Sequence, residues 1–208
     1  MEDVLDVYHL PDDPRYPTVC FDETNKQLIN EVRTPLPAEP GQPERYDTEY
    51  ERNGVQNLFM FFSPTRNWRH VKVTDRRTKV DYAHCMRELV DALLPDAVRI
   101  RVVQDNLNTH TPAALYEVFA PAEAKRILAR LEFHYTPKHG SWLNMAEIEL
   151  SVLSRQCLDR RIPAKELLQQ EVGAWEERRN HNGATVNWRF TTVDARIKLK
   201  RLYPSIED

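Results

Sequence analysis

The sequence has little cysteine and no long apolar run, and each shortage excludes a class of protein. Cys20, Cys85 and Cys157 lie far apart and form no CxxC pair, so neither a zinc ribbon nor a secreted disulfide framework is expected. No apolar stretch approaches the roughly 18 residues of a membrane-spanning helix. The acidic start, MEDVLDVYHLPDD, lacks the basic-then-apolar order of a signal peptide. We therefore expect a protein of the reducing cytosol with no membrane partner.

What the sequence does contain suits one folded domain. Its 208 residues are 41% apolar and 29% charged, which is enough to bury a core. The net charge of −3 averages two unlike regions, because residues 1–51 hold 4 Lys/Arg against 13 Asp/Glu and residues 52–208 hold 25 against 19. The basic remainder permits a polyanionic partner without requiring one.

The order of the expected elements is that of a mixed α/β domain. Residues 1–17 are expected to be an acidic, irregular lead-in, and the proline-rich residues 34–45 an extended loop. Strands are expected at 18–21, 55–62, 68–74, 98–104 and 133–136. Helices are expected at 80–94, 121–131, 143–158 and 164–179.

Two acidic residues follow expected strands. Asp22 comes after TVCF and Asp105 after IRVVQ. Ligands collect at the carboxyl ends of strands in such sheets, so these carboxylates converge if the strands are neighbours. A third acid from a passing helix would then complete an oxygen cage for Mg²⁺. The alternative is that each Asp caps a helix or closes a turn, which is the commoner fate of an Asp at a strand end.

The run QDNLNTH adds polar company to the second acid. It places Asn106 and His110 within a few positions of Asp105. Amide and imidazole donors beside a carboxylate suit holding a phosphate or orienting water. An Asx-turn cluster with His110 on the surface is the competing interpretation.

The segment YTPKHGSWLNMAEIEL combines a basic pair with the start of an acidic helix. Lys138 and His139 lie nearest the predicted site and are the better phosphate contacts. At about 100° per residue, Glu147 and Glu149 flank the apolar stripe of the helix on opposite sides. Periodicity therefore leaves both acids open. The tryptophans of the chain are expected in the core or at an interface: Trp68, Trp142, Trp175 and Trp188.

In this order, FDET, QDNLNTH and HGSWLNMAE resemble the three signature blocks of the Tc/mariner superfamily of DDE transposases. More narrowly, they resemble its bacterial insertion-sequence branch. The resemblance extends from about Thr18 to Pro204 and implies a ribonuclease-H-like fold, a mixed β-sheet flanked by α-helices. That fold agrees with the order of the expected elements.

The resemblance also assigns the acids. The first catalytic acid falls on Asp22, the second on Asp105 and the third on Glu147, three positions after the asparagine of an LNPIE-type block that here reads LNMAE. Two departures keep Glu149 as a rival third acid. Met145 replaces the usual proline, and the 41 residues between the second and third acids exceed the gap common in eukaryotic relatives.

The implied activity is DNA strand cleavage and strand transfer by a catalytic domain over residues 18–208. The same three acids would bind two Mg²⁺ ions, with Mn²⁺ able to substitute. The partners would be transposon ends and target DNA. The protein would act as a homodimer, in a bacterial cytoplasm and in association with the nucleoid. The residues expected to contact DNA lie beside the acids in sequence: Lys138, His139, His110 and Asn106.

Transposases of this kind usually carry a helix-turn-helix region before the catalytic domain. Here the first catalytic strand begins at residue 18, so we expect that half to be absent, either encoded in a second frame or lost in a truncated copy. Two other functions stay open. One is an inactive or repurposed remnant that binds DNA, against which the intact acids argue, and the other is a ribonuclease-H-like nuclease acting on hybrids or junctions.

Overall fold

The computed structural model describes residues 1–138 and 140–203. In these residues a five-stranded sheet has the order β3–β2–β1–β4–β5. The strands are β1 (Thr18–Glu31), β2 (Tyr50–Ser63), β3 (Trp68–Thr74), β4 (Ile100–Gln104) and β5 (Leu131–Tyr135). β4 pairs in parallel with β1 and β5, whereas β1, β2 and β3 pair antiparallel. The expected mixed sheet flanked by helices is confirmed.

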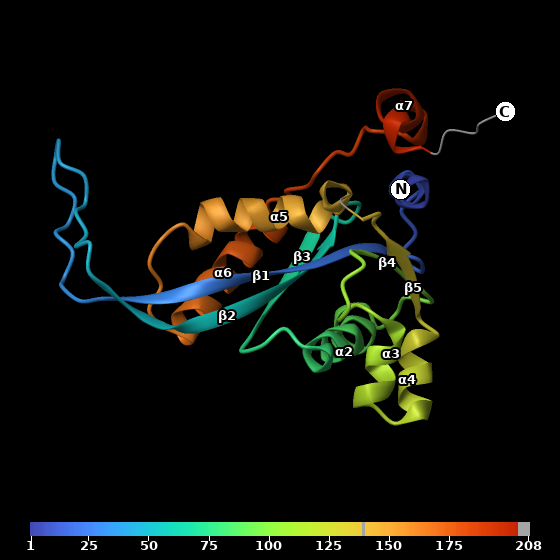
Figure 1. Ribbon diagram of the computed structural model, residues 1–208, viewed down its shortest axis with the longest axis horizontal. Coiled ribbons are helices and arrows are strands. Elements are labelled where there is room, and N and C mark those ends of the chain that lie inside the picture. The colour runs from blue at the N-terminus through green and yellow to red at the C-terminus, as the bar shows by residue number, and fades with distance from the viewer. Residues whose placement is uncertain (139, 204–208) are drawn as a thin grey trace.

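Helices cover both faces of the sheet (Figure 1). One layer contains α2 (Lys79–Glu88), α3 (Pro112–Val118) and α4 (Pro121–Leu128). The other contains α1 (Glu2–Tyr8), α5 (Met145–Leu153), α6 (Lys165–His181) and α7 (Thr192–Lys198). The remaining turns are η1 (Leu89–Leu93), η2 (Ser141–Leu143), η3 (Ser154–Leu158) and η4 (Lys200–Leu202). None of the helices in the described residues has the length and apolar character needed to cross a bilayer.

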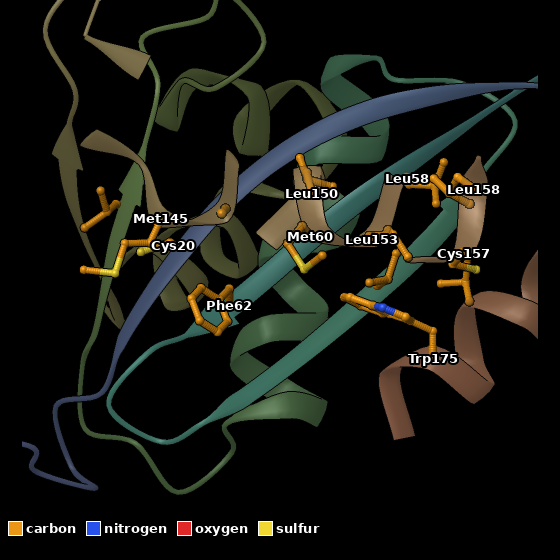
Figure 2. Packing of buried hydrophobic residues seen from close by; sticks show 14 of the residues in the cluster. Cys20, Leu58, Met60, Phe62, Met145, Leu150, Leu153, Cys157, Leu158 and Trp175 are labelled. Carbon is orange, nitrogen blue, oxygen red and sulfur yellow. The ribbon is translucent and has the colours of Figure 1, made fainter. Parts of the chain in front are cut away.

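β2 belongs to the core on both of its faces. Its run Leu58–Phe62 is fully apolar because alternate side chains enter different layers. Leu58, Met60 and Phe62 lie under α5 and α6, while Phe59 and Phe61 lie against α2. Figure 2 shows the first group gathered with the apolar side chains of α5 and α6. The expected strand at 55–62 is confirmed, and it extends further at both ends.

β1 runs well past the expected end of the first strand. Its parallel pairing with β4 ends at Cys20 opposite Val103. Its antiparallel pairing with β2 continues through Asp22 opposite Met60 and on to Glu31. Asp22 was expected to follow the end of a strand, but it lies within β1. It is still paired with β2 there and lies just beyond the last residue of β1 that pairs with β4. Because β4 no longer covers this side of β1, Asp22 lies at an open edge of the sheet, where a site can form.

The expectation of an irregular lead-in is wrong. Residues 2–8 form α1, because Val4, Leu5 and Val7 bury one face of a helix in the same core as α5 and α6. Tyr8 then donates a hydrogen bond to the carbonyl of Leu143, with 2.7 Å between the two oxygens. The first residues thus support the turn that begins α5.

The expected proline-rich loop is confirmed. Between β1 and β2 the chain forms a long projecting hairpin (Figure 1), where only isolated bridges such as Leu36–Arg45 join its two sides. Its residues are largely exposed, as four prolines that cannot donate backbone hydrogen bonds would predict.

The packing of α5 predicts a large effect of truncating Leu153. This side chain is fully buried against the sheet (Figure 2), whereas Ser151 of the same helix is exposed. We expect Leu153→Ala to lower the free energy of unfolding by about 2–5 kcal/mol, because it leaves a cavity. Ser151→Ala should change it by less than about 0.5 kcal/mol. Urea unfolding followed by circular dichroism measures both, and equal effects would contradict this packing.

Candidate active site

Asp22 is a largely buried carboxylate in the middle of β1. Its Oδ1 accepts a hydrogen bond from the backbone N–H of Glu23 at 2.8 Å. The pKa of Asp22 is raised to about 7, mainly by burial; that hydrogen bond opposes the shift, and the negative charges of Asp105, Glu23 and Glu147 add to it. The pKa of Asp22 thus depends on both other predicted acids, Asp105 just after β4 and Glu147 in α5. Asp105 and Glu147 therefore lie close enough to Asp22 for their charges to act on its pKa.

Asn144 fixes the helix that carries Glu147. Its side chain is fully buried and caps α5, because its Oδ1 accepts from the N–H of Ala146 at 3.1 Å. Its Nδ2 donates to the carbonyl of Phe21 at 2.8 Å and to Oδ2 of Asp22 at 3.4 Å. One amide therefore joins the start of α5 to the strand that holds the first acid.

Asp105 is held by His110. Its Oδ1 accepts from the N–H of Leu107 at 3.3 Å and lies 2.6 Å from Nδ1 of His110. Burial alone would raise the pKa of Asp105, but the hydrogen bond and the charge of His110 outweigh it and hold that pKa below its usual value. The Asx turn of the competing interpretation is therefore present and shares this carboxylate with the site, but His110 does not lie on the surface.

His110 is a buried cation between two carboxylates. Its ring is 1% exposed, and its Nε2 lies 2.9 Å from Oε2 of Glu23. Burial would lower the pKa of His110, but hydrogen bonds to Asp105 and Glu23 raise it to about 9. The ring also stacks on Tyr82, with 5.0 Å between the centroids. The expectation that His110 contacts DNA is contradicted, because its ring is covered and both its nitrogens face carboxylates.

The two rival third acids have opposite surroundings. Glu147 is exposed in the first turn of α5, and the Oγ of Ser141 lies 3.5 Å from its Oε1. Glu149 is fully buried and its Oε1 lies 2.9 Å from Nε of Arg69 and 2.7 Å from Nε of Arg179. Glu149 is therefore neutralised by two guanidinium groups, and Glu147 is the acid of α5 whose charge reaches Asp22.

Of the other residues expected to contact DNA, Asn106 and Lys138 lie beside Asp105. Beside Asp105 lies an open cavity of about 340 Å³, lined also by Asn106, Lys138 and Ser141. Asn106 and Lys138 are exposed at its rim, as a contact to a phosphate requires. His139 lies outside the described residues.

The three acids supply oxygen donors, which are the ligands that Mg²⁺ and Mn²⁺ prefer. Among the described residues no three His, Cys, Asp or Glu side chains are placed so that they could hold a metal ion together. Burial is the main cause of the raised pKa of Asp22, and the charges that add to it, those of Asp105, Glu23 and Glu147, are all negative. An arrangement of this kind fits a divalent cation that draws the carboxylates together.

Two residues of this site are missed by reasoning from the sequence. Asn144 serves there only as a landmark of the LNMAE block, although it joins α5 to β1. Glu23 follows Asp22 and is not considered, although it is the second partner of His110. The alternation of a strand could have found Glu23, because a residue next to Asp22 must face the opposite layer.

Comparisons with known proteins give one family and one fold. Residues 17–169 match the family model described as DDE superfamily endonuclease. None of the curated proteins matches the sequence.

Solved structures similar to this chain include three complexes of the Mos1 transposase. They are its paired-end complex with the left transposon end (15% identity, TM-score 0.57, 81% of this chain), its strand transfer complex (16%, 0.57, 86%) and its mariner paired-end complex with Mn (16%, 0.52, 86%). This chain covers 51%, 54% and 55% of those chains, about half of their length. At these identities the likeness concerns the fold, which is that of the ribonuclease-H-like transposase catalytic domains.

Stability should separate the two rival acids. We expect Glu149→Ala to lower the free energy of unfolding by about 3–5 kcal/mol, because it leaves the buried Arg69 without its counter-charge. Glu147→Ala should lower it by less than about 0.5 kcal/mol, because that side chain is exposed. Urea unfolding at neutral pH measures the difference, and a larger loss from Glu147→Ala would refute the assignment of these surroundings.

The pKa of Asp22 predicts a pH-dependent gain from Asp22→Asn in metal-free buffer. In the folded protein this pKa stands near 7 instead of 3.8, so the folded state binds the proton more tightly and loses stability as the pH rises between those values. The neutral variant avoids that loss. We expect its stability advantage to grow from about pH 4 to about pH 7, to level off above, and to reach about 1 kcal/mol or more.

Chemical denaturation across this pH range measures the advantage. Asp96→Asn is the control, because Asp96 is exposed and the substitution should leave the pH profile unchanged. An advantage of Asp22→Asn that does not vary with pH would contradict the raised pKa.

Proposed function

The chain belongs to the DDE superfamily endonuclease family, and from that premise we propose that it is the catalytic domain of a Tc/mariner-type transposase. It would cleave DNA strands at transposon ends and transfer the freed 3′-hydroxyl to target DNA. The observation that supports this proposal is the contact of Asn144, at the start of the helix that carries Glu147, with Phe21 and Asp22 of β1, together with the raised pKa of Asp22, to which the charges of Asp105 and Glu147 contribute. Titratable groups perturbed in this way concentrate at functional sites.

The three carboxylates would be the metal ligands of the site. Asp22, Asp105 and Glu147 offer only oxygen donors, which suits two Mg²⁺ ions, and Mn²⁺ in the same places. When bound, such ions supply positive charge to the attacking and leaving oxygens of a phosphodiester. Glu147 is exposed and its first-turn position leaves it free to accept a proton from the attacking water or hydroxyl.

His110 and Asn144 would act as positioning residues. His110 contacts Asp105 through Nδ1 and so limits the orientations of that carboxylate. Asn144 limits where α5, and with it Glu147, starts relative to Asp22. Glu149 would have no part in the chemistry, because its two arginines occupy it.

The DNA would enter over the cavity beside Asp105. Lys138 and Asn106 at its rim would contact the phosphates that flank the reacting bond, with His139 next to them in sequence. Solved structures of the Mos1 transposase in complexes named for a transposon end and for strand transfer support a DNA partner for this fold.

The assembly and setting are further parts of the proposal. We propose that residues 18–208 form the catalytic domain of an insertion-sequence transposase of bacteria, acting as a homodimer at the nucleoid. The chain covers about half of the transposase chains that it resembles in fold, and recognition of the transposon ends would be the task of a helix-turn-helix half.

Loss of one predicted ligand should abolish the activity. We expect wild-type protein to nick supercoiled plasmid in Mg²⁺, and Asp105→Asn to lower the rate at least about 100-fold, because a neutral amide holds a divalent cation poorly. Asp96→Asn removes an exposed acid away from the site and should retain the wild-type rate. Gel electrophoresis of the plasmid forms, in Mg²⁺, Mn²⁺ and chelator, measures each rate.

Two results would overturn the proposal. One is full nicking by Asp105→Asn, which would exclude these acids as the ligands. The other is a strong preference for an RNA–DNA hybrid over DNA duplexes, which would indicate a ribonuclease-H-type nuclease instead.

A further inference from the structure

Trp142 is exposed to solvent and directly follows a residue of the site in sequence. It belongs to η2, directly after Ser141, which lines the cavity beside Asp105 and lies 3.5 Å from Glu147 through its Oγ. Trp142 is 42% exposed, whereas Trp175 in the core is 2% exposed. A large aromatic surface is therefore open to solvent at the residue that follows Ser141, which lines the cavity beside Asp105.

Other aromatic rings hold Trp142 in place from behind. Its ring stacks on Trp188, with 6.3 Å between the centroids and 20° between the planes, and meets Phe190 edge-on at 5.9 Å. Trp188 is itself fixed, because its Nε1 donates to the carbonyl of Phe190 at 2.9 Å and its ring packs 5.5 Å from that of Tyr8. These rings come from α1, η2 and the segment that joins α6 to α7 past the start of α5 (Figure 1).

A positive charge borders the same group of rings. The Nζ of Lys198 lies 5.6 Å from the centre of the Phe190 ring and 3.6 Å from Oδ1 of Asp194, and Lys138 is exposed at the rim of the cavity. Flat aromatic surface between cations is the combination that binds single-stranded nucleic acid, because bases stack on the rings while the cations follow the phosphates.

We propose that Trp142, supported by Trp188 and Phe190, is a stacking site for an unpaired nucleobase of the strand whose phosphodiester lies over Asp22, Asp105 and Glu147. This inference rests on the proposed function, because the DNA must already lie over the carboxylates. A base inside a duplex has both faces covered by its neighbours, so only an unstacked base can use the ring. The stacking energy would offset the cost of pulling that base out next to the reacting bond.

Binding of two DNA probes tests the site. One is a duplex with a short single-stranded thymine tail, and the other is the same duplex with blunt ends. We expect Trp142→Ala to weaken binding of the tailed probe by about 5-fold or more, because stacking on an aromatic ring accounts for that much per base. Binding of the blunt probe should change by less than about 2-fold. Fluorescence anisotropy in Ca²⁺ measures both affinities without cleavage.

Two variants control the test. Trp142→Phe keeps a stacking ring and should retain most of the affinity for the tailed probe. Tyr116→Ala removes a ring that is 50% exposed on α3, in the opposite layer, and should change neither affinity. Thermal unfolding of each variant by circular dichroism shows whether it folds.

A measurement on the unmodified chain covers the case in which Trp142→Ala does not fold. Iodouracil in the thymine tail crosslinks under light to an aromatic ring that stacks on it, and mass spectrometry of the peptides identifies the residue. We expect the crosslink at Trp142. A crosslink confined to other residues would overturn the proposal.

The remaining outcomes separate this proposal from the proposed function. Equal losses for both probes together with a changed molecular mass in light scattering would mean that Trp142 joins protein copies, and the stacking site would be wrong. Unchanged binding of both probes by a folded Trp142→Ala that still nicks plasmid would overturn the stacking site alone. A wild-type chain that binds neither probe and does not nick plasmid would overturn both.

Discussion

The site depends on one buried side chain, the amide of Asn144. It donates to the carbonyl of Phe21 and to the carboxylate of Asp22, and it accepts from the N–H that begins α5. No solvent reaches it, so a lost bond would leave a polar group buried without a partner. That penalty sets the start of α5 against β1, and Glu147, one turn further on, stands near Asp22 as a result. Tyr8 supports the same start through the carbonyl of Leu143.

The acids near Asn144 differ in whether positively charged side chains neutralise them. Glu149 is buried with two arginines and serves the packing of α5 against β3 and α6. Asp22 is buried beside other carboxylates, and the raised pKa records the resulting loss of stability at neutral pH. A fold selected for stability alone would neutralise both. Asp105 lies between these cases, since His110 stabilises its charge and holds its orientation.

The success of the sequence-based predictions follows the range of the interactions involved. The strand β2 was predictable because its run Leu58–Phe62 is apolar at every position and suits burial in two layers. The proline-rich hairpin was predictable because proline acts locally. α1 and the far half of β1 were not, because each is stabilised by distant residues, α1 by the core under α5 and β1 by antiparallel pairing with β2. Likewise, the run QDNLNTH by itself does not show that His110 pairs with Glu23 of β1.

The sequence by itself determined the family, the mixed sheet and the acids that could meet, because motifs and apolar periods are properties of the chain alone. The LNMAE block favoured Glu147 over Glu149, but only the tertiary structure showed that the surroundings of the two acids differ. The two acids stand two residues apart on one helix, on opposite sides of its apolar stripe, and no period distinguishes them. Their surroundings do, because Arg69 and Arg179 arrive from other elements to neutralise one acid, while β1 brings Asp22 near the other.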